Sequence, residues 1–224
     1  MGSQKVTAKR FETGIVAKVE DYLNQHFADQ VRVVGKRIGL WKYAELRETL
    51  SKSVVLCPDI DFLLAPLVSS THPLIIAVEA KAVYLRNNRT NIKFYEGLDE
   101  ALALLRFGVD KVLFFQVFLV PGRNNTERDQ MIEVFIHYPM AVRDIVRTTG
   151  LPISYTPAVD IVVENQLLPG NIRVLDLKEP GNHREEEQLI LRTERPNPFL
   201  SSSSLKYPPI IRDFLLDRFI HAAR

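Results

Sequence analysis

Two periods of hydrophobic residues divide the chain into candidate helices and strands. Near the start, Val16, Val19 and Leu23 recur at the spacing of one helix face, whereas later apolar residues alternate or run consecutively, as in strands. Clusters of Pro, Gly, Asn and Ser separate these segments. The pattern predicts helices at 8–27, at 40–50, from Leu98 to a cap at Gly108, near 140–149 and at 208–222, and strands at 31–38, 52–57, 59–67, 74–82, 111–120, 131–138 and 158–164.

Two features of this pattern predict the architecture. The run LIIAV at 74–78 is apolar at every position, which is typical of a central strand covered on both faces. From about residue 165 the chain becomes rich in Pro, Gly and Ser and regains a helical pattern only near its end. Because helices alternate with strands only partly, we expect an α/β fold with a central mixed β-sheet flanked by helices. We assign this core to residues 1–164, and residues 165–224 to an irregular C-terminal extension with a closing helix, packed on the core.

Composition excludes several classes of protein. The 224 residues carry a net charge of +2, so nucleic-acid binding would need a local basic patch rather than a strong overall charge. The single cysteine, Cys57, excludes a disulfide framework, a four-cysteine zinc site and a cysteine-ligated iron–sulfur cluster. The N-terminus lacks the apolar core of a signal peptide, and no apolar run is long enough for a membrane span. We therefore expect a cytoplasmic protein with no membrane partner.

Charged residues interrupt the two apolar strands predicted around residues 59–82. Strand side chains alternate between faces, so Glu79 shares a face with Lys81, and Asp59 shares one with Asp61. Burying a carboxylate without a partner costs about several kcal/mol, and a hard divalent cation offsets this cost. A lysine beside such a cation can orient or activate water, or neutralise charge that builds up on a phosphodiester. These residue types suit metal-dependent phosphodiester hydrolysis.

The stretches Pro58-Asp59 and Glu79-Ala80-Lys81, with 19 residues between Asp59 and Glu79, resemble the motif of the PD-(D/E)xK nuclease superfamily. The order of predicted elements over about residues 8–120 is also similar, and implies a restriction-endonuclease-like core. The resemblance implies Mg²⁺ or Mn²⁺ as cofactor, held by Asp59 or Asp61, by Glu79 and by the carbonyl of Ala80. It also implies that Lys81 acts on water and phosphate.

The resemblance leaves several assignments open. The literal motif favours Asp59 as the first metal ligand, whereas the apolar run after Asp61 favours that residue. Many relatives carry a glutamine on the helix after this motif, and Glu100 lies near that place here. Some members add a glutamate from the first helix; at about 100° per residue Glu12, not Glu20, is in line with the apolar face, although a first-turn carboxylate also suits the helix dipole.

Function is expected to follow the family. Most members cut DNA rather than RNA, so DNA is the expected substrate, and members often dimerise, which leaves a homodimer open for this chain. The basic residues Arg86, Arg89 and Lys93 are candidates for phosphate contacts, although a basic surface loop would have the same composition. The alternatives are an inactive nuclease-fold subunit that binds nucleic acid or protein, and an unrelated α/β domain whose matches are accidental.

Overall fold

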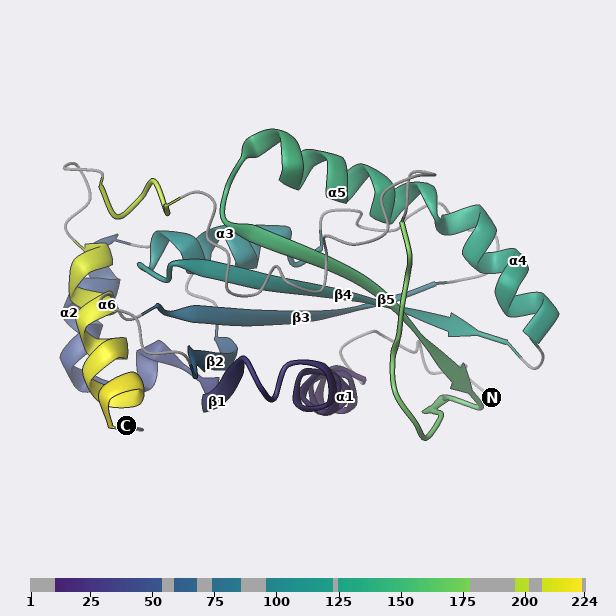
Figure 1. Ribbon diagram of the computed structural model, residues 1–224, viewed down its shortest axis with the longest axis horizontal. Coiled ribbons are helices and arrows are strands. Elements are labelled where there is room, and N and C mark those ends of the chain that lie inside the picture. Colours follow the sequence, from purple (N-terminus) through teal and green to yellow (C-terminus); the bar gives the residue numbers. More distant parts are fainter. Residues whose placement is uncertain are drawn as a thin grey trace.

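The protein is built from a single sheet and the helices that cover it (Figure 1). The computed structural model of the chain describes residues 11–53, 59–67, 74–85, 96–122, 125–177, 196–201 and 207–222. Its helices are α1 (Glu12–His26), η2 (Leu40–Lys42), α2 (Ala44–Ser53), α3 (Leu98–Arg106), α4 (Asn125–Phe135), α5 (His137–Thr149), α6 (Tyr207–Leu215) and the π-helical η3 (Leu216–His221). Its strands are β1 (Val31–Ile38), β2 (Ile60–Pro66), β3 (Ile76–Tyr84), β4 (Lys111–Pro121), β5 (Ile153–Val163), β6 (Gln166–Leu167) and β7 (Arg173–Val174).

The sheet is mixed. Its strands are ordered β1-β2-β3-β4-β5-β6, and β7 also pairs with β5. The three central strands β3, β4 and β5 run parallel, whereas β1, β2, β6 and β7 are antiparallel to their neighbours. Helix α3 connects β3 to β4, and the pair α4–α5 connects β4 to β5, as parallel neighbours require. The predicted α/β class with a central mixed sheet flanked by helices is therefore confirmed.

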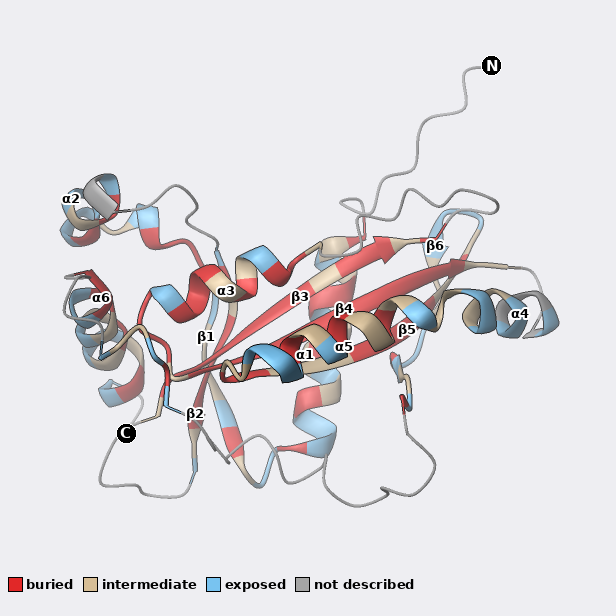
Figure 2. Cartoon of the chain, turned by 90° about the horizontal axis from the view of Figure 1, so that it is seen from above, coloured by how far each residue is buried: buried red, intermediate tan, exposed pale blue. Residues whose placement is uncertain are grey.

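The two faces of the sheet are covered by different helices (Figure 1). Helix α1 packs its buried residues Ile15, Val16, Val19 and Leu23 against one face. Helices α3 and α5 lie over the other face, where side chains of α6 join the same apolar cluster. Strands β3 and β4 are buried over most of their length (Figure 2), which explains why their sequences are largely apolar.

Strands β2 and β3 separate soon after they pair. Their antiparallel register covers only Phe62↔Val78, Leu63↔Ala77 and Leu64↔Ile76, yet β3 continues to Tyr84 in parallel register with β4. The side of β3 that faced β2 is thus released from pairing beyond Val78. The charged residues of both strands begin at this point of separation.

One predicted strand is a helix. The segment 131–138, expected as a strand, forms the end of α4 and the start of α5. Its apolar residues Met131, Ile132 and Phe135 follow helical spacing and pack on one cluster, whereas Val134 points outward with 68% of its surface exposed. β-branched and aromatic residues favour a strand locally, but the one-sided burial needs a helix.

Other boundaries also differ from the expectation. The strand expected at 52–57 begins inside α2, which extends to Ser53, and residues 54–58 lie outside the described part of the chain. Strand β5 begins at Ile153, five residues before the predicted strand, and continues through Pro157. A proline is tolerated there because β5 has only short partners on one of its sides.

The C-terminal part of the chain contributes to both the sheet and the core. Strands β6 and β7 pair with β5, and Tyr207, Ile211 and Leu215 of α6 join the largest apolar cluster. The single closing helix expected at 208–222 consists of α6 followed by the π-helical turn η3.

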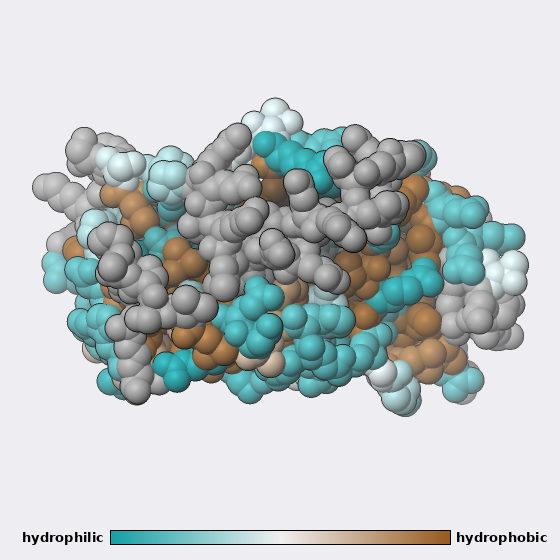
Figure 3. All heavy atoms as spheres, viewed as in Figure 1, coloured by the Kyte–Doolittle hydropathy of each residue, from teal (hydrophilic) through white to brown (hydrophobic). Residues whose placement is uncertain are grey.

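Apolar side chains also reach the surface. In the view of Figure 3 they gather beside α4, over the region where β4 and β5 cross in Figure 1. Within the ranges that the structure describes, no helix combines the length and apolar character needed to cross a membrane.

Candidate functional site

Three charged residues meet where β2 and β3 separate. Continuing the register by one step from Phe62↔Val78 sets Asp61 opposite Glu79. Strand alternation turns both side chains, and that of Lys81, toward the face covered by α3. Asp61 Oδ2 accepts a hydrogen bond of 2.8 Å from the backbone N–H of Ala80. The Asp61 carboxylate therefore binds a backbone group of β3 just beyond the last β2–β3 pair.

Glu79 is a buried carboxyl group. Only 3% of its surface is exposed. Burial, its hydrogen bond with Glu100 and the negative charge of Asp61 raise the pKa of Glu79 to about 10. Without a cation other than Lys81, the group is protonated at neutral pH and shares its hydrogen bond with the Glu100 carboxylate.

Asp61 lies in a similar but less extreme environment. Burial raises its pKa to about 6, opposed by the Ala80 N–H and assisted by the negative charge of Glu100. Lys81 lowers this pKa and Glu12 raises it, so both residues are near enough to interact with Asp61. The group carries most of its negative charge at neutral pH.

Lys81 is held among carboxylates. Its Nζ donates to both oxygens of Glu100, at 2.9 and 3.2 Å, and lies 3.8 Å from Glu12 Oε1. Burial lowers the pKa of Lys81, but the hydrogen bond and charge of Glu100 outweigh this and leave the pKa raised. For Glu100, burial acts to raise the pKa, but the hydrogen bonds from Glu79 and Lys81 leave it lowered. Lys81 is therefore an ammonium at neutral pH.

Helix α3 reaches Lys81 through a glycine. Gly97 precedes α3 with φ of +90°, a conformation that favours glycine. A Cβ at this position would lie 2.9 Å from Lys81 Cβ and 2.8 Å from Phe114 Cε2. The absence of a side chain lets the first turn of α3, which carries Glu100, approach β3 closely.

The structure separates the two candidate aspartates. Asp61 belongs to the cluster described above, whereas Asp59, two residues before it, is exposed. A Cβ on Gly39 would lie 3.0 Å from Asp59 Oδ1, which places Asp59 beside the segment that leads into η2. Asp59 and Asp61 therefore do not act at one point.

Of the other predicted site residues, some lie near this cluster and others do not. Glu12 lies near Lys81, whereas Glu20, the other acid of α1 that was considered, pairs with Lys36 of β1. The Ala80 carbonyl belongs to the strand between Glu79 and Lys81. The proposed phosphate contacts Arg86, Arg89 and Lys93 lie outside the described residues, as does Pro58 of the motif.

Glu100 is the contact that the sequence left without a role. It touches Lys81 and Glu79 at once. The available signal was a carboxylate in the first turn of the helix that follows the strand of Glu79 and Lys81. The resemblance also placed Glu100 near the position of a helical glutamine, but a first-turn acid is common for helix-dipole reasons, so its contact with Lys81 was not predicted.

The donor types suit a hard divalent cation, but the side chains do not enclose one in this conformation. Carboxylate and carbonyl oxygens are the ligands that Mg²⁺ and Mn²⁺ prefer. Across the described ranges, however, no three His, Cys, Asp or Glu side chains are grouped so that they could hold a metal ion. Glu79 and Lys81 both bind Glu100 instead. The chemistry of the site fits a metal, and the arrangement would have to open to admit it.

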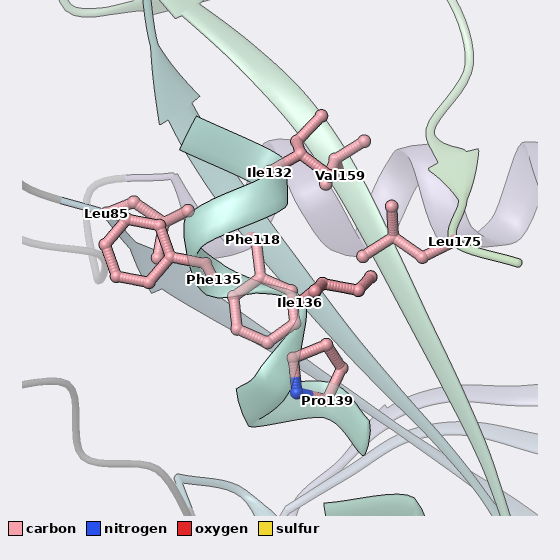
Figure 4. A pocket seen from close by; sticks show the side chains of 8 residues that line it. All are labelled: Leu85, Phe118, Ile132, Phe135, Ile136, Pro139, Val159 and Leu175. Atoms are coloured by element: carbon pink, nitrogen blue, oxygen red, sulfur yellow. The ribbon is translucent and has the colours of Figure 1, made fainter. Parts of the chain in front are cut away.

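A cavity elsewhere in the described part of the protein is lined by no side chain that could bind a metal or take part in catalysis. A space of about 10 Å³ lies between α4, α5 and the sheet, and Figure 4 shows the side chains that line it. Its lining side chains are all apolar: Leu85, Phe118, Ile132, Phe135, Ile136, Pro139, Val159 and Leu175. A space at the lower limit for one water, with no polar side chain, is a packing gap rather than a binding site.

Comparison with known proteins does not assign a family. No protein-family model and no curated protein matches the sequence. Among solved structures, that of SfsA from Pyrococcus furiosus in complex with Ca²⁺ is similar over 74% of this chain, at 13% identity and a TM-score of 0.28. The chain spans 60% of the length of that protein. Because the TM-score is so low, the functional argument rests on the site alone.

Proposed function

We propose that this protein is a metal-dependent nuclease that hydrolyses phosphodiester bonds, preferably of DNA, in the cytoplasm. The proposal includes the PD-(D/E)xK assignment and a restriction-endonuclease-like core around β2, β3, α3 and β4. The observation that carries it is the meeting of Asp61, Glu79 and Lys81 where β2 and β3 separate. The carboxyl groups of Asp61, Glu79 and Glu100 around the Lys81 ammonium have no evident value for stability, since burial of such groups is costly.

In this proposal Asp61, Glu79 and the Ala80 carbonyl would hold Mg²⁺ or Mn²⁺, and Glu12 would assist from α1. The bound cation would supply charge stabilisation at the phosphoryl oxygens and a more acidic water. Lys81, held as an ammonium, would donate hydrogen bonds to a phosphate oxygen and orient the attacking water. Glu100 would keep Lys81 in place before the substrate binds, because both of its oxygens accept hydrogen bonds from Nζ.

A second candidate function is a non-catalytic nuclease-fold subunit that binds nucleic acid or protein. Two observations favour it. Lys81 and Glu79 both hydrogen-bond Glu100. Among the described residues, no three His, Cys, Asp or Glu side chains are arranged to hold a metal ion. Residues whose hydrogen bonds are all made within the protein can be kept for structure without any role in catalysis.

Calorimetric titration with Mg²⁺ and Mn²⁺, followed by cleavage assays on labelled DNA and RNA, tests the proposal. We expect metal binding and DNA cleavage by the wild type, and a loss of more than about 100-fold in both for Asp61→Ala and Glu79→Ala, because even residues that only support metal ligands are worth 10–100-fold. Asp59→Ala is the matched control and should stay near wild type, because Asp59 is exposed outside the cluster.

Three outcomes are informative. Binding of nucleic acid with neither metal binding nor cleavage would favour the non-catalytic subunit. Equal losses in Asp59→Ala and Asp61→Ala would contradict the assignment of Asp61. A wild type that binds neither metal nor nucleic acid would reject the nuclease and the nucleic-acid-binding subunit, and would leave only a protein-binding subunit.

A further inference from the structure

A chain of buried hydrogen bonds lies behind the candidate site. Gln116 of β4 is only 1% exposed and interrupts a strand that is otherwise apolar from Val112 to Val120. Its Oε1 accepts a hydrogen bond of 2.6 Å from the hydroxyl of Tyr155 on β5. Its Nε2 donates one of 3.2 Å to the backbone carbonyl of Glu96. Three segments are therefore linked by one amide.

The orientation of this amide is determined by its partners. The Glu96 carbonyl can only accept a hydrogen bond, so Nε2 has to face it. Oε1 then faces Tyr155, whose hydroxyl has to donate. Burial raises the pKa of Tyr155, which keeps the hydroxyl protonated and able to donate.

The chain of hydrogen bonds ends at the turn that brings α3 to Lys81. Glu96 directly precedes Gly97, where an added Cβ would collide with the Lys81 side chain and Phe114. In parallel register Lys81 is the neighbour of Gln116, so both side chains project from the same face of the sheet. Glu100, which binds Lys81, follows Gly97 by one helical turn.

Stability alone does not account for these residues. Burying an amide and a hydroxyl in an apolar sheet is unfavourable unless every group is paired, and apolar residues would pack there without this requirement. The hydrogen bonds of Gln116 and Tyr155 instead fix the relative positions of the groups that they join. The hydrogen bond from the Gln116 amide fixes the distance between the Glu96 carbonyl and β4, and thereby determines where the first turn of α3 begins.

We propose that Tyr155 and Gln116 are positioning residues for the candidate catalytic site. Through the Glu96 carbonyl they set the first turn of α3 against β3, and so hold Glu100 on Lys81. The catalytic part of this inference rests on the proposed nuclease function. The structural part, that Tyr155 controls the surroundings of Lys81, does not depend on it.

The test uses Tyr155→Phe, which removes one hydroxyl, and Gln116→Met, which keeps the length of the side chain without its hydrogen bonds. In the DNA-cleavage assay we expect kcat to fall by about 10-fold or more in each variant while KM stays within about 2-fold, because the substrate contacts are unchanged. The double variant should lose no more than the more severe single variant, since both residues act through one chain. Tyr43→Phe, which removes a hydroxyl from a half-buried ring packed on Phe214, is the matched control and should leave kcat unchanged.

A second measurement keeps this inference separate from the nuclease proposal. The ¹³Cε resonance of Lys81 in the intact protein should shift in Tyr155→Phe and not in Tyr43→Phe, whether or not the wild type cuts DNA. A wild type without activity, combined with this shift, would reject the nuclease function and retain the positioning role. An unchanged Lys81 resonance in Tyr155→Phe, or an equal loss of kcat in Tyr43→Phe, would overturn the positioning role.

Discussion

At the scale of single residues, the site is defined by several carboxyl groups that surround one cation, the Lys81 ammonium. Asp61 and Glu79 approach each other across the end of the β2–β3 pairing, and Glu100 reaches them from α3. Lys81 neutralises part of this charge, and protonation of Glu79 removes more. The environment of each carboxyl group favours its neutral form or a cation beside it.

This environment predicts how stability depends on pH in the absence of divalent metal. The pKa of Asp61 is raised from 3.8 to about 6, so the folded state binds this proton more tightly than the unfolded state. Its contribution to stability is complete below about pH 4 and is lost as the pH rises through about 6. Glu79 acts with the same sign, between 4.5 and about 10.

We therefore expect Asp61→Asn to become progressively more stable than the wild type as the pH rises from 4 to 6.5 in EDTA. Thermal denaturation followed by circular dichroism measures this difference, and Asp59→Asn is the control that should track the wild type. Mg²⁺ should raise the wild-type Tm more at pH 8 than at pH 5, because metal binding requires deprotonated ligands. A Tm difference between Asp61→Asn and wild type that does not change with pH would contradict the environment assigned to Asp61.

At the scale of elements, the position of α3 depends on a residue without a side chain. Gly97 combines a φ of +90° with a close approach to Lys81 and Phe114. Gly170 has a similar φ, of +109°, but in the described part of the chain, its two chain neighbours apart, no heavy atom lies within 4 Å of the place that its Cβ would take. The two glycines thus share a positive φ, which would strain any other residue, and differ in how crowded their surroundings are.

This contrast gives a matched pair of substitutions. Gly170→Ala should lower the free energy of unfolding by about 1–2 kcal/mol, the cost of the left-handed conformation for alanine. Gly97→Ala should cost about 1–3 kcal/mol more, because Lys81 and Phe114 have to shift. Urea denaturation measures both costs, and equal values would show that α3 does not need its close approach to β3.

At the scale of the whole molecule, distant segments are tied to the core through buried polar groups. Asn197, 2% exposed, donates to the carbonyls of Leu105 and Val109 at 2.7 and 2.6 Å, at the end of α3 and before β4. Nearby, Arg212 of α6 donates to the Gly108 carbonyl and Asp110 Oδ2, at 3.1 and 2.8 Å. The C-terminal segments therefore support the loop between α3 and β4, which follows the helix that carries Glu100.

Asn197→Ala should be strongly destabilising. It removes a donor from two buried carbonyls, of which that of Leu105 still accepts a hydrogen bond from the Gly108 N–H, so we expect a loss of about 1–3 kcal/mol in the free energy of unfolding. Asn171→Ala is the control. Asn171 is exposed, and its side-chain amide donates a hydrogen bond of 2.8 Å to Gln25 Oε1. The loss of this hydrogen bond should cost less than about 0.5 kcal/mol. Chemical denaturation of both variants measures the difference, and comparable losses would contradict the anchoring role of Asn197.

The sequence by itself determined most of the elements and the identity of the candidate chemistry. Apolar runs predicted β3 and β4, helical spacing predicted α1 and α3, and strand alternation set Glu79 and Lys81 on one face. These features depend on local periodicity, which a single chain displays directly. The same local view misassigned the end of α4, because its β-branched residues favour a strand unless their one-sided burial is known.

Only the tertiary structure decided which charges meet. Asp59 and Asp61 have the same parity and nearly the same sequence context, but only Asp61 is next to the last β2–β3 pair and accepts the Ala80 N–H, whereas Asp59 lies beside Gly39. Glu100 became part of the site through Gly97, and Gln116 gained a partner 39 positions away in Tyr155. Contacts of this kind depend on where two strands separate and how closely a helix approaches, and neither leaves a periodic signal in the sequence.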